Sequence, residues 1–400
     1  MANIRINRNA AGQPISATIR VHRGRNASGK QLKPWLKNID LSACRTEKAA
    51  QKRAADEAAV FERECRAGLV GDGRRKFAEY SEYVLNLKES REALKRSTIC
   101  RYRQLLQRIL PEIGYMKLSE IRPDHLNDLY SKLSAPGSAS NGGTLSPKTV
   151  TEHHRLIHMV FEQAVKEQLL VSNPADRVTL PKVVKKDVNY YQPETVQRIL
   201  TALDDEPIKW QLFIHLLLIT GCRRGEILGL TWEKIDFSNS KIHITQSVLY
   251  SSENGLYVDT PKTQTSVRWI TVPQETLNLI KEYKLSETEQ GHSFERFHSD
   301  SFVFCQLDGK SPMHPHSVKC FLQRFEKKNG LPHLNAHAFR HTAASMLLFN
   351  GADLAGVSRR LGHSKISTTS DIYVHVLEES DKRNADILEN ALSNLKEKKA

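Results

Sequence analysis

Two short breaks divide this 400-residue chain into three stretches with different residue patterns. The first break, GLVGDG, is glycine-rich and covers residues 68–73, and the second, VVKKDVN, is polar and basic and covers residues 183–189. A chain of this length exceeds one ordinary domain, and segments of this composition are typical linkers. We therefore predict three domains, over residues 1–68, 74–182 and 190–400.

The first stretch alternates apolar and polar side chains before it becomes helical. Residues 15–21 alternate, Gly24 to Gly29 form a turn, and residues 32–41 predict a returning strand. Residues 46–66 have a helical pattern, with Thr46 as the candidate N-cap. This order predicts a small sheet packed on one helix.

Positive charge is concentrated in this same stretch. The chain has a net charge of +14, and residues 1–76 hold 17 Lys and Arg against 7 Asp and Glu, with no acid before Asp40. Such a concentration indicates nucleic acid or an anionic membrane as the partner. Because aromatic and β-branched residues are interleaved with the charge, we favour a DNA-reading sheet over a solvated basic end. The candidate contacts are Arg20, Arg23, Arg25, Lys30 and Lys33.

The middle stretch has apolar residues at helical spacing throughout. The predicted helices cover residues 77–87, 97–110, 123–133 and 147 to about 170, with a Gly- and Ser-rich loop at 135–147. This pattern predicts a compact all-α unit. Because helix N-termini favour anions, the residues near helix starts are candidate phosphate contacts: Arg96, Thr98, Arg101 and Lys148.

Several function classes lack their signatures. The six cysteines are dispersed, with no C-x-x-C pair for zinc, and there is no P-loop for ATP. No apolar run reaches the roughly 20 residues of a membrane span, and the N-terminus has no signal-peptide core. We expect reduced thiols, no metal, no cofactor, no membrane partner and a cytoplasmic location.

The third stretch is mostly helical, with strands expected near residues 241–249, 256–259 and 267–272, and a terminal helix over residues 378–397. The expected fold class is therefore α+β, mostly α, with a small antiparallel sheet in this last domain. Lys262 lies between two of the predicted strands, where a hairpin tip could project it into a cleft. Turn lysines are usually only solubilising.

Cationic residues recur at element ends in this stretch. Arg223 follows Thr220-Gly221, where an apolar helix ends. His337 and Arg340 share one helix face at i, i+3 spacing behind a candidate Asn335 cap, and His341, at i+4, could join them. Each feature alone is common in helices.

A second group lies near the end of the chain. His363 follows Gly362, which ends a predicted helix over residues 354–361, and Tyr373 follows ten positions later. A histidine after a helix end is often structural, and an isolated tyrosine is usually a core residue. A phenol facing concentrated positive charge, however, suggests attack on a phosphate. Guanidinium groups bind two phosphate oxygens at once, and cations favour the phenolate of a tyrosine, whose ordinary pKa is about 10.

In order and spacing these segments resemble the tyrosine recombinases, the phage-integrase group. The resemblance is carried by TGCRRGEILGLTW, TPKTQTSVRWITVP, HAFRHTAAS and LGHSKISTTSDIYVHV, within about residues 190–380. It implies that Tyr373 is the nucleophile, that Arg223 and Arg340 hold the scissile phosphate, and that His337 and His363 donate hydrogen bonds and assist proton transfer. It implies further that Lys262 is the general acid and that Glu226 orients the site. The helical stretch resembles the core-binding domain of this family, and the basic N-terminal stretch resembles the arm-binding domain of larger integrases.

The resemblance implies site-specific DNA strand exchange through a 3′-phosphotyrosine, which integrates and excises a phage or other mobile element. The implied partners are duplex DNA, a homotetramer on that DNA, an excision directionality factor and a host DNA-bending protein, on the chromosome of a bacterial host. Two-metal nucleases need clustered carboxylates, which these segments lack. A regulator without catalysis need not keep the nucleophile, and a type IB topoisomerase would share the chemistry. The terminal helix could dock on a neighbouring protomer or on its own domain.

Overall fold

The computed structural model describes residues 2–9, 12–24, 29–44, 46–66, 75–91, 93–139, 142–184, 189–260, 264–289 and 300–370. The chain separates into two compact units, Met1–Val184 and Lys185–Ala400. This boundary falls inside the second predicted linker, residues 183–189. The first unit contains a small sheet with one helix and, beyond residues 67–74, a helical bundle with its own core.

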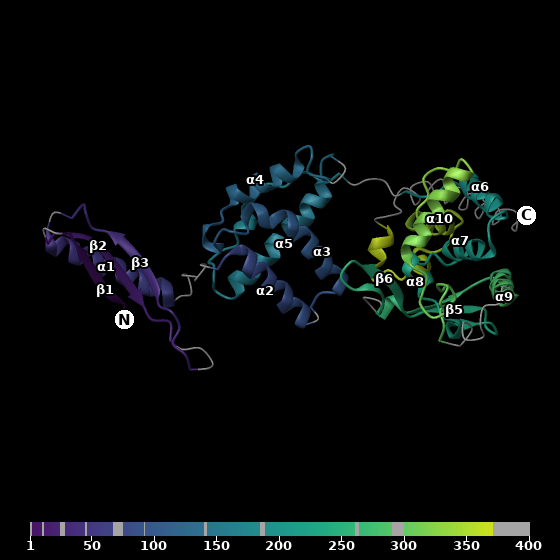
Figure 1. Cartoon of the computed structure of the whole chain (residues 1–400), viewed down its shortest axis with the longest axis horizontal. Helices are drawn as coiled ribbons and strands as arrows, with labels where there is room; N and C mark the ends of the chain where they lie inside the picture. Colours follow the sequence, from purple (N-terminus) through teal and green to yellow (C-terminus); the bar gives the residue numbers. More distant parts are fainter. Residues whose placement is uncertain are drawn as a thin grey trace, which may run out of the picture. The chain divides into compact units, whose positions relative to one another are not determined.

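A three-stranded antiparallel sheet forms the N-terminal part of the chain. Its strands are β1 (Asn3–Arg8), β2 (Pro14–Val21) and β3 (Trp35–Asp40), in the order β1-β2-β3. Helix α1 (Glu47–Arg66) covers one face of the sheet (Figure 1). The Thr46 hydroxyl accepts a hydrogen bond from the Ala49 N–H at 3.3 Å, as expected of its N-cap. The sequence prediction missed β1, although NIRINR alternates.

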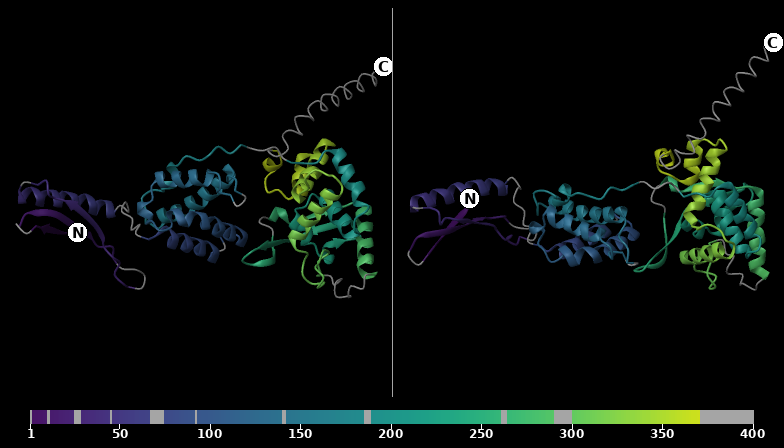
Figure 2. Two further views of the ribbon diagram at one scale, coloured as in Figure 1. Left: turned by 45° about the horizontal axis from the view of Figure 1, so that its top comes forward. Right: turned by 90° about the horizontal axis from the view of Figure 1, so that it is seen from above.

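The alternation of β2 decides which face the helix covers. Ala17, Ile19 and Val21 are buried against α1, where Ala54, Ala58 and Phe61 contact the sheet. The opposite face carries Thr18, paired with Arg5, and Arg20, paired with Asn3. Arg5 and Arg20 are both exposed there. The two further views show the helix on one side of the sheet only (Figure 2).

Four helices form the bundle of residues 75–184. They are α2 (Phe77–Ser90), α3 (Arg96–Ile113), α4 (Pro123–Ser134) and α5 (Pro147–Lys166), with short 3₁₀ turns at Leu118–Glu120 and Pro174–Arg177. Helices α4 and α5 begin with proline, and the Ser146 hydroxyl caps α5 at the Thr149 N–H. The predicted end of α5 near residue 170 is wrong. The helix ends at Lys166, and Gln168 then adopts a φ of +56°.

The second unit is mostly helical around one core. Its helices are α6 (Pro193–Leu203), α7 (Ile208–Thr220), α8 (Arg224–Leu228), α9 (Gln274–Glu289), α10 (Pro315–Lys328), α11 (Ala336–Phe349) and α12 (Leu354–Leu361). Helix α7 is apolar on all sides and lies in the centre of that core, with buried Leu212, Phe213, Ile214, Leu216 and Leu217. None of the helices that the structure describes is long and apolar enough to cross a membrane.

Two small antiparallel sheets flank these helices. β4 (Ile235–Asp236), β5 (Lys241–Ile244) and β8 (Arg268–Thr271) form one in the order β4-β5-β8, and β6 (Ser247–Ser251) pairs with β7 (Gly255–Asp259) in the other. Short 3₁₀ turns lie at Trp232–Lys234 and Gln264–Ser266. The fold is thus α+β and mostly helical, as predicted.

Two details of the predicted strands are wrong. The expected strand over residues 241–249 is β5 followed by β6, which belong to different sheets. Between them the Gln246 side-chain amide donates to the Gly229 carbonyl at 2.8 Å, which holds the chain where it changes sheet. The strands on either side of Lys262, β7 and β8, also belong to different sheets, so this segment joins two sheets and is not a hairpin tip. Lys262 itself lies outside the described residues.

Candidate active site

Two left-handed glycines end the helices that precede Arg223 and His363. Gly221 ends α7 with a φ of +64°, and Gly362 ends α12 with a φ of +71°. A Cβ on Gly221 would lie 2.7 Å from the Leu361 Cδ2 atom, so the two helix ends approach each other closely. Both helix ends were predicted from the sequence. Arg223 lies two residues after Gly221, and His363 lies one residue after Gly362.

Arg340 is the most buried charge in this region. It lies on α11, whose first turn is capped by Asn335 through a 2.8 Å hydrogen bond from the Ala338 N–H. Its side chain is 1% exposed, and its Nη1 donates to the Gly221 carbonyl at 2.8 Å. Its Nη2 is buried and has no hydrogen-bond partner among the residues that the structure describes. A buried donor without a partner is costly to the fold.

Glu226 is a buried carboxylate between two arginines. Its Oε1 accepts from Arg223 Nη1 at 2.8 Å, and its Oε2 accepts from the Arg223 backbone N–H at 3.0 Å and from Arg268 Nη2 at 2.9 Å. Burial alone would raise the pKa of Glu226, but Arg268 and then Arg223 hold that pKa below its ordinary value. Glu226 therefore stays ionised and fixes one nitrogen of Arg223.

Positive charge exceeds negative charge in this cluster. Among the described residues, the guanidinium groups of Arg223 and Arg268 bind the Glu226 carboxylate, and that of Arg340 lies close enough for its charge to interact with it. Burial, followed by repulsion from Arg223, lowers the pKa of Arg340 from 12.5 to about 10. Arg223 keeps its side chain 44% exposed and so can reach an incoming group. The arrangement is suited to an anion.

Three histidines lie near the arginine cluster, and all have depressed pKa values. Burial, followed by Arg340, lowers the pKa of His363 to about 4, and burial followed by His337 lowers that of His341 to about 4. The pKa of His337 is also lowered, by burial and by Arg340. The His363 Nδ1 lies 2.8 Å from the buried Thr369 hydroxyl, and the His337 and His341 rings meet edge-on at 4.5 Å. Neutral imidazoles of this kind can exchange protons with a reacting group.

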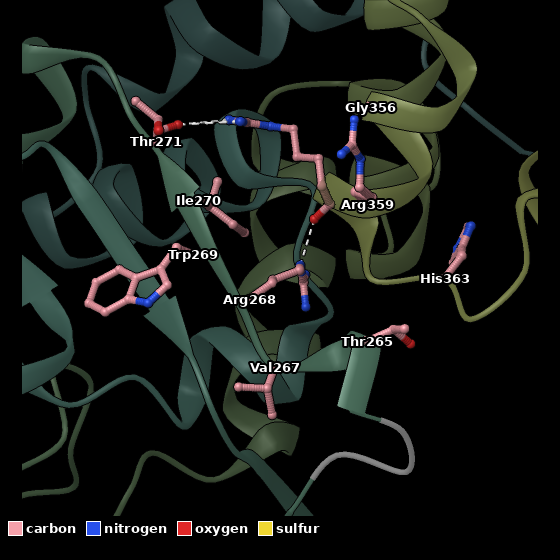
Figure 3. Close-up of a pocket in the computed structure, with 10 residues that line it drawn as sticks. Thr265, Val267, Arg268, Trp269, Ile270, Thr271, Gly356, Arg359 and His363 are labelled. Carbon is pink, nitrogen blue, oxygen red and sulfur yellow. Dashed lines mark hydrogen bonds between the residues drawn. The ribbon is translucent and has the colours of Figure 1, made fainter.

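A pocket of about 580 Å³ lies between β8 and α12 (Figure 3). Its lining includes Thr265, Arg268, Trp269, Arg359, Arg360 and His363. The Arg360 side chain donates to the carbonyls of Ile219 and Thr271, so it braces α12 against the end of α7 and the end of β8. The pocket therefore adjoins the cluster of Arg223, Arg268 and Arg340 through Arg268, and His363 also lines it.

The structure brings together Arg223, Glu226 and Arg340, with His337 and His363 close enough for their charges to interact. Lys262 and Tyr373 lie outside the described residues, as does the terminal helix predicted over residues 378–397. Sequence reasoning missed Arg268. The signal was present, because a lone arginine at an inward position of the apolar strand VRWITV must be paired when buried.

The predicted DNA contacts of the N-terminal sheet differ in position. Arg20 is exposed on the face that α1 leaves open, and Lys30 and Lys33 are exposed in the segment between β2 and β3. The Arg23 guanidinium lies 4.9 Å from the centre of the Trp35 ring. Arg25 is outside the described residues. Arg5, which sequence reasoning missed together with β1, shares the open face with Arg20.

In the helical bundle three of the four candidates lie in the first turn of a helix, and Arg101 lies in the second turn of α3. Arg96 is exposed at the first position of α3, Thr98 is half-buried in its first turn, and Lys148 is exposed in the first turn of α5. Arg101 pairs with Glu152 of α5 at 2.9 Å. The charge of Arg101 is therefore partly engaged within the bundle, and its role as a phosphate contact stays a prediction, like those of the other three.

Two family models match this chain. One, described as Phage integrase family, matches residues 189–380, and another, described as Phage integrase, N-terminal SAM-like domain, matches residues 76–134. The chain is also 29% identical over 249 residues to the ICEBs1 integrase of Bacillus subtilis (strain 168). That alignment covers 62% of this chain and 67% of that protein.

Solved structures share the fold. The chain is similar to the Tn1549 transposon integrase in complex with a circular intermediate DNA, with a TM-score of 0.64 and 24% identity over 77% of this chain and 99% of that one. It is also similar to lambda integrase in a tetramer bound to a Holliday junction. There the TM-score is 0.55 and the identity 16%, over 92% of this chain and 94% of that one. At these identities the likeness establishes the fold alone.

Proposed function

This chain belongs to the phage integrase family of tyrosine recombinases, and we propose that its arginine cluster binds the scissile phosphate of duplex DNA while Tyr373 attacks that phosphate. The chain is accordingly a site-specific DNA recombinase of the kind that integrates mobile elements.

The observation that carries the proposal is the unbalanced charge at Arg340. This fully buried guanidinium lies next to Arg223 and Arg268, its Nη2 has no partner, and it forms no ion pair within the described part of the chain. A phosphodiester supplies non-bridging oxygens that accept from Arg340 and Arg223 together. Its transition state carries more negative charge than the ground state, so these fixed cations stabilise it preferentially.

The proposed reaction balances without a cofactor. The Tyr373 phenolic oxygen attacks phosphorus and its proton passes to solvent, while the bond from phosphorus to the 5′-oxygen breaks and Lys262 protonates that oxygen. The products are a 3′-phosphotyrosine and a free 5′-hydroxyl. A 5′-hydroxyl from a second duplex then attacks the phosphotyrosine and releases Tyr373. One phosphate ester replaces another at each step, so no ATP is consumed.

Chain connectivity supports these two assignments. Tyr373 follows the described helical residues 366–370 by three positions, and this helix holds Thr369, the hydrogen-bond partner of His363. Three residues span at most about 10 Å. Lys262 is two positions from Thr260 and two from Gln264, which adjoins the pocket-lining Thr265. The described residues nearest to both assigned side chains therefore adjoin His363 and the pocket.

We assign His337 and His363 to hydrogen bonding and proton transfer at the phosphate, and Glu226 to orienting Arg223. The Thr369 hydroxyl fixes the orientation of the His363 ring. Because both histidines have lowered pKa values in the DNA-free chain, a bound phosphate would raise those pKa values and favour the protonated, donating form.

The remainder of the chain would hold the DNA. We assign residues 1–68 to arm-type sites, residues 74–182 to the core site, and residues 190–400 to catalysis, with a homotetramer joining two duplexes. Integration and excision would use the same chemistry, and a directionality factor and a host DNA-bending protein would set its direction. Exposed arginines on the open face of the N-terminal sheet, Arg5 and Arg20, support its role as a groove reader.

A covalent adduct tests the chemistry. The probe is a duplex enriched from a randomised pool by binding to this protein, mapped for its cleaved bond and nicked beside it so that the cut fragment diffuses away. The unaltered chain should form an SDS-resistant adduct. Tyr373→Phe should abolish the adduct without weakening binding, whereas Tyr115→Phe, at an exposed tyrosine of the helical bundle, should retain it. An adduct with Tyr373→Phe would refute the assignment.

The leaving group gives an independent test of Lys262. Lys262→Ala should cleave slowly when the leaving atom is oxygen, because an alkoxide must depart unprotonated. A substrate with sulfur at the 5′-bridging position should restore its rate, since a thiolate needs no proton to depart. A variant that stays slow with both substrates would contradict the role of Lys262 as the acid.

The salt dependence of binding tests the N-terminal sheet. Arg5→Ala and Arg20→Ala should each weaken binding to the enriched duplex and reduce the slope of log K against log salt by about 1 for each phosphate that the protein no longer neutralises. Arg63→Ala, on the outer face of α1, is the control and should leave the slope unchanged. An unchanged slope in the two sheet variants would count against this surface.

A further inference from the structure

Arg268 connects its own strand to the start of α8 and to the end of α12 in the second unit. Its side chain is buried on β8 and makes four hydrogen bonds to groups outside its own strand: to Glu226 Oε2 at 2.9 Å, to Cys222 Sγ at 3.2 Å, to the Ser266 carbonyl at 2.9 Å and to the Arg360 carbonyl at 2.6 Å. Figure 3 shows it between the strand and α12. The segment TPKTQTSVRWITVP contains this residue, but the family resemblance implied no role for it.

We propose that Arg268 is a positioning residue for strand cleavage: it holds Glu226 so that Glu226 presents Arg223 to the scissile phosphate, and it fixes the helix end that carries His363. This inference rests on the proposed function. It extends the reactive assembly to a side chain that does not touch the DNA.

The first half of the inference follows from the geometry at Glu226. One carboxylate oxygen binds Arg223 Nη1, and the other binds both Arg268 Nη2 and the Arg223 backbone N–H. Without Arg268 the carboxylate would keep only Arg223, and it could rotate toward that half-exposed guanidinium. Arg223 would then be neutralised and displaced from the place where the phosphate binds.

The second half follows from the contact with the end of α12. Arg268 Nε donates to the Arg360 carbonyl, two residues before Gly362. A Cβ on Gly362 would lie 2.8 Å from Arg268 Nη1, so the guanidinium packs against the turn that leads to His363. A third bond, to the Ser266 carbonyl, connects the same side chain to the segment that follows Lys262.

Arg360 provides the comparison that separates positioning from general bracing. It is also an arginine of the pocket wall, and it also links α12 to β8. Its side chain, however, bonds only backbone carbonyls, at Ile219 and Thr271, in the part of the chain that the structure describes. Arg360→Met therefore removes a brace of similar size and leaves Glu226 with both of its arginines.

The dependence of the cleavage rate on pH separates the two roles, because the loss of a purely structural contact would not change it. The charged and titratable groups that face Glu226 are Arg223 at the start of α8, Arg268 on β8, Arg340 on α11 and the Cys222 thiol. Removal of the Arg268 cation leaves the burial of Glu226 less compensated, so Glu226 takes up a proton at higher pH. The cleavage rate of Arg268→Met should therefore begin to fall at a higher pH than that of the unaltered chain when the pH is lowered.

The experiment measures single-turnover adduct formation across pH with the nicked, enriched duplex described above, and measures binding of the same duplex by anisotropy. Arg268→Met should cleave about 100-fold more slowly, the typical cost of misplacing a reacting group by about 1 Å, while its affinity changes by less than about threefold. Arg268→Lys should recover part of the rate, because it keeps the charge but not the planar fork. Arg360→Met should stay within about threefold of the unaltered rate.

A double variant keeps the test decisive if Arg268→Met alone does not fold. Arg268→Met with Glu226→Gln leaves no unpaired charge at the contact between these two residues, and it should fold, cleave slowly and show no loss of activity on the acidic side. Cleavage by Arg268→Met at the unaltered rate and pH profile would overturn the inference. Equal losses in Arg268→Met and Arg360→Met, with no rescue by lysine, would overturn it as well. Failure of the unaltered chain to form any adduct would instead overturn the proposed function, on which the inference depends.

Discussion

Replacing Arg340 with methionine should slow cleavage strongly without unfolding the protein. The side chain is 1% exposed, and burial followed by repulsion from Arg223 lowers its pKa from 12.5 to about 10. Each pKa unit corresponds to about 1.4 kcal/mol, so the charge costs the folded state about 3 kcal/mol. The folded pKa lies below the unfolded one, and pH 7 is below both, so the whole penalty is present at neutral pH.

The substitution also removes a favourable interaction. The hydrogen bond from Arg340 Nη1 to the Gly221 carbonyl, a charge-assisted bond, is worth about 1.5–3 kcal/mol. The two effects nearly cancel, so we expect the free energy of unfolding to change by less than about 2 kcal/mol. Arg268→Met should behave differently, because breaking a buried ion pair typically costs about 3–5 kcal/mol. The cleavage rate of Arg340→Met should fall roughly 100- to 1000-fold.

Denaturant unfolding of the DNA-free variants at pH 7 measures how much Arg340→Met changes the free energy of unfolding. The transition that Arg268→Met shifts identifies the unfolding of the second unit. Inorganic phosphate should then stabilise the unaltered chain more than Arg340→Met, because a ligand stabilises only the form that binds it. A loss of stability in Arg340→Met as large as that in Arg268→Met would refute the reasoning. So would equal stabilisation of both chains by phosphate.

Three further changes test other contacts. Gly225→Ala would bring a Cβ within 2.7 Å of the Val248 carbonyl, so thermal unfolding should show a loss of about 1–3 kcal/mol; an unchanged midpoint would contradict the close packing. Thr369→Val removes the hydrogen bond to His363 Nδ1 and should slow cleavage without weakening DNA binding, measured by single-turnover assay and anisotropy; an unchanged rate would contradict the orienting role. The pKa values of His341 and His363, near 4 and below their ordinary 6.5, contribute stability that is full above about pH 6.5 and lost as pH falls toward 4. Urea midpoints against pH should show this slope, and a flat profile would contradict it.

Features governed by neighbours in sequence could be predicted from it. Gly221 and Gly362 end helices because they adopt left-handed backbone, and Asn335 caps the helix of Arg340 with its side chain. The i, i+4 spacing of His337 and His341 likewise brought their rings together. In each of these cases the cause lies within four residues, so a local pattern was sufficient.

Features governed by distant contacts could not be predicted. The division of residues 241–251 into β5 and β6 depends on Gln246 binding Gly229, 17 positions away. The role of Arg268 depends on Glu226 and on the Arg360 carbonyl, which are 42 and 92 positions away. A sequence pattern shows that a strand contains an arginine, but only the fold shows which carboxylate and which helix end that arginine holds.

The surplus of arginine over carboxylate near Arg340 makes this site unfavourable in the DNA-free protein. Glu226 compensates Arg223 and Arg268, and in the proposed site the charge of Arg340 is left to the substrate. A phosphate that binds there relieves a cost already present in the folded chain, so part of the binding free energy comes from the removal of repulsion. The developing charge of the transition state relieves it further, and this extra gain lowers the barrier to cleavage. A second carboxylate beside Arg340 would stabilise the fold, but it would compete with the scissile phosphate for the same guanidinium.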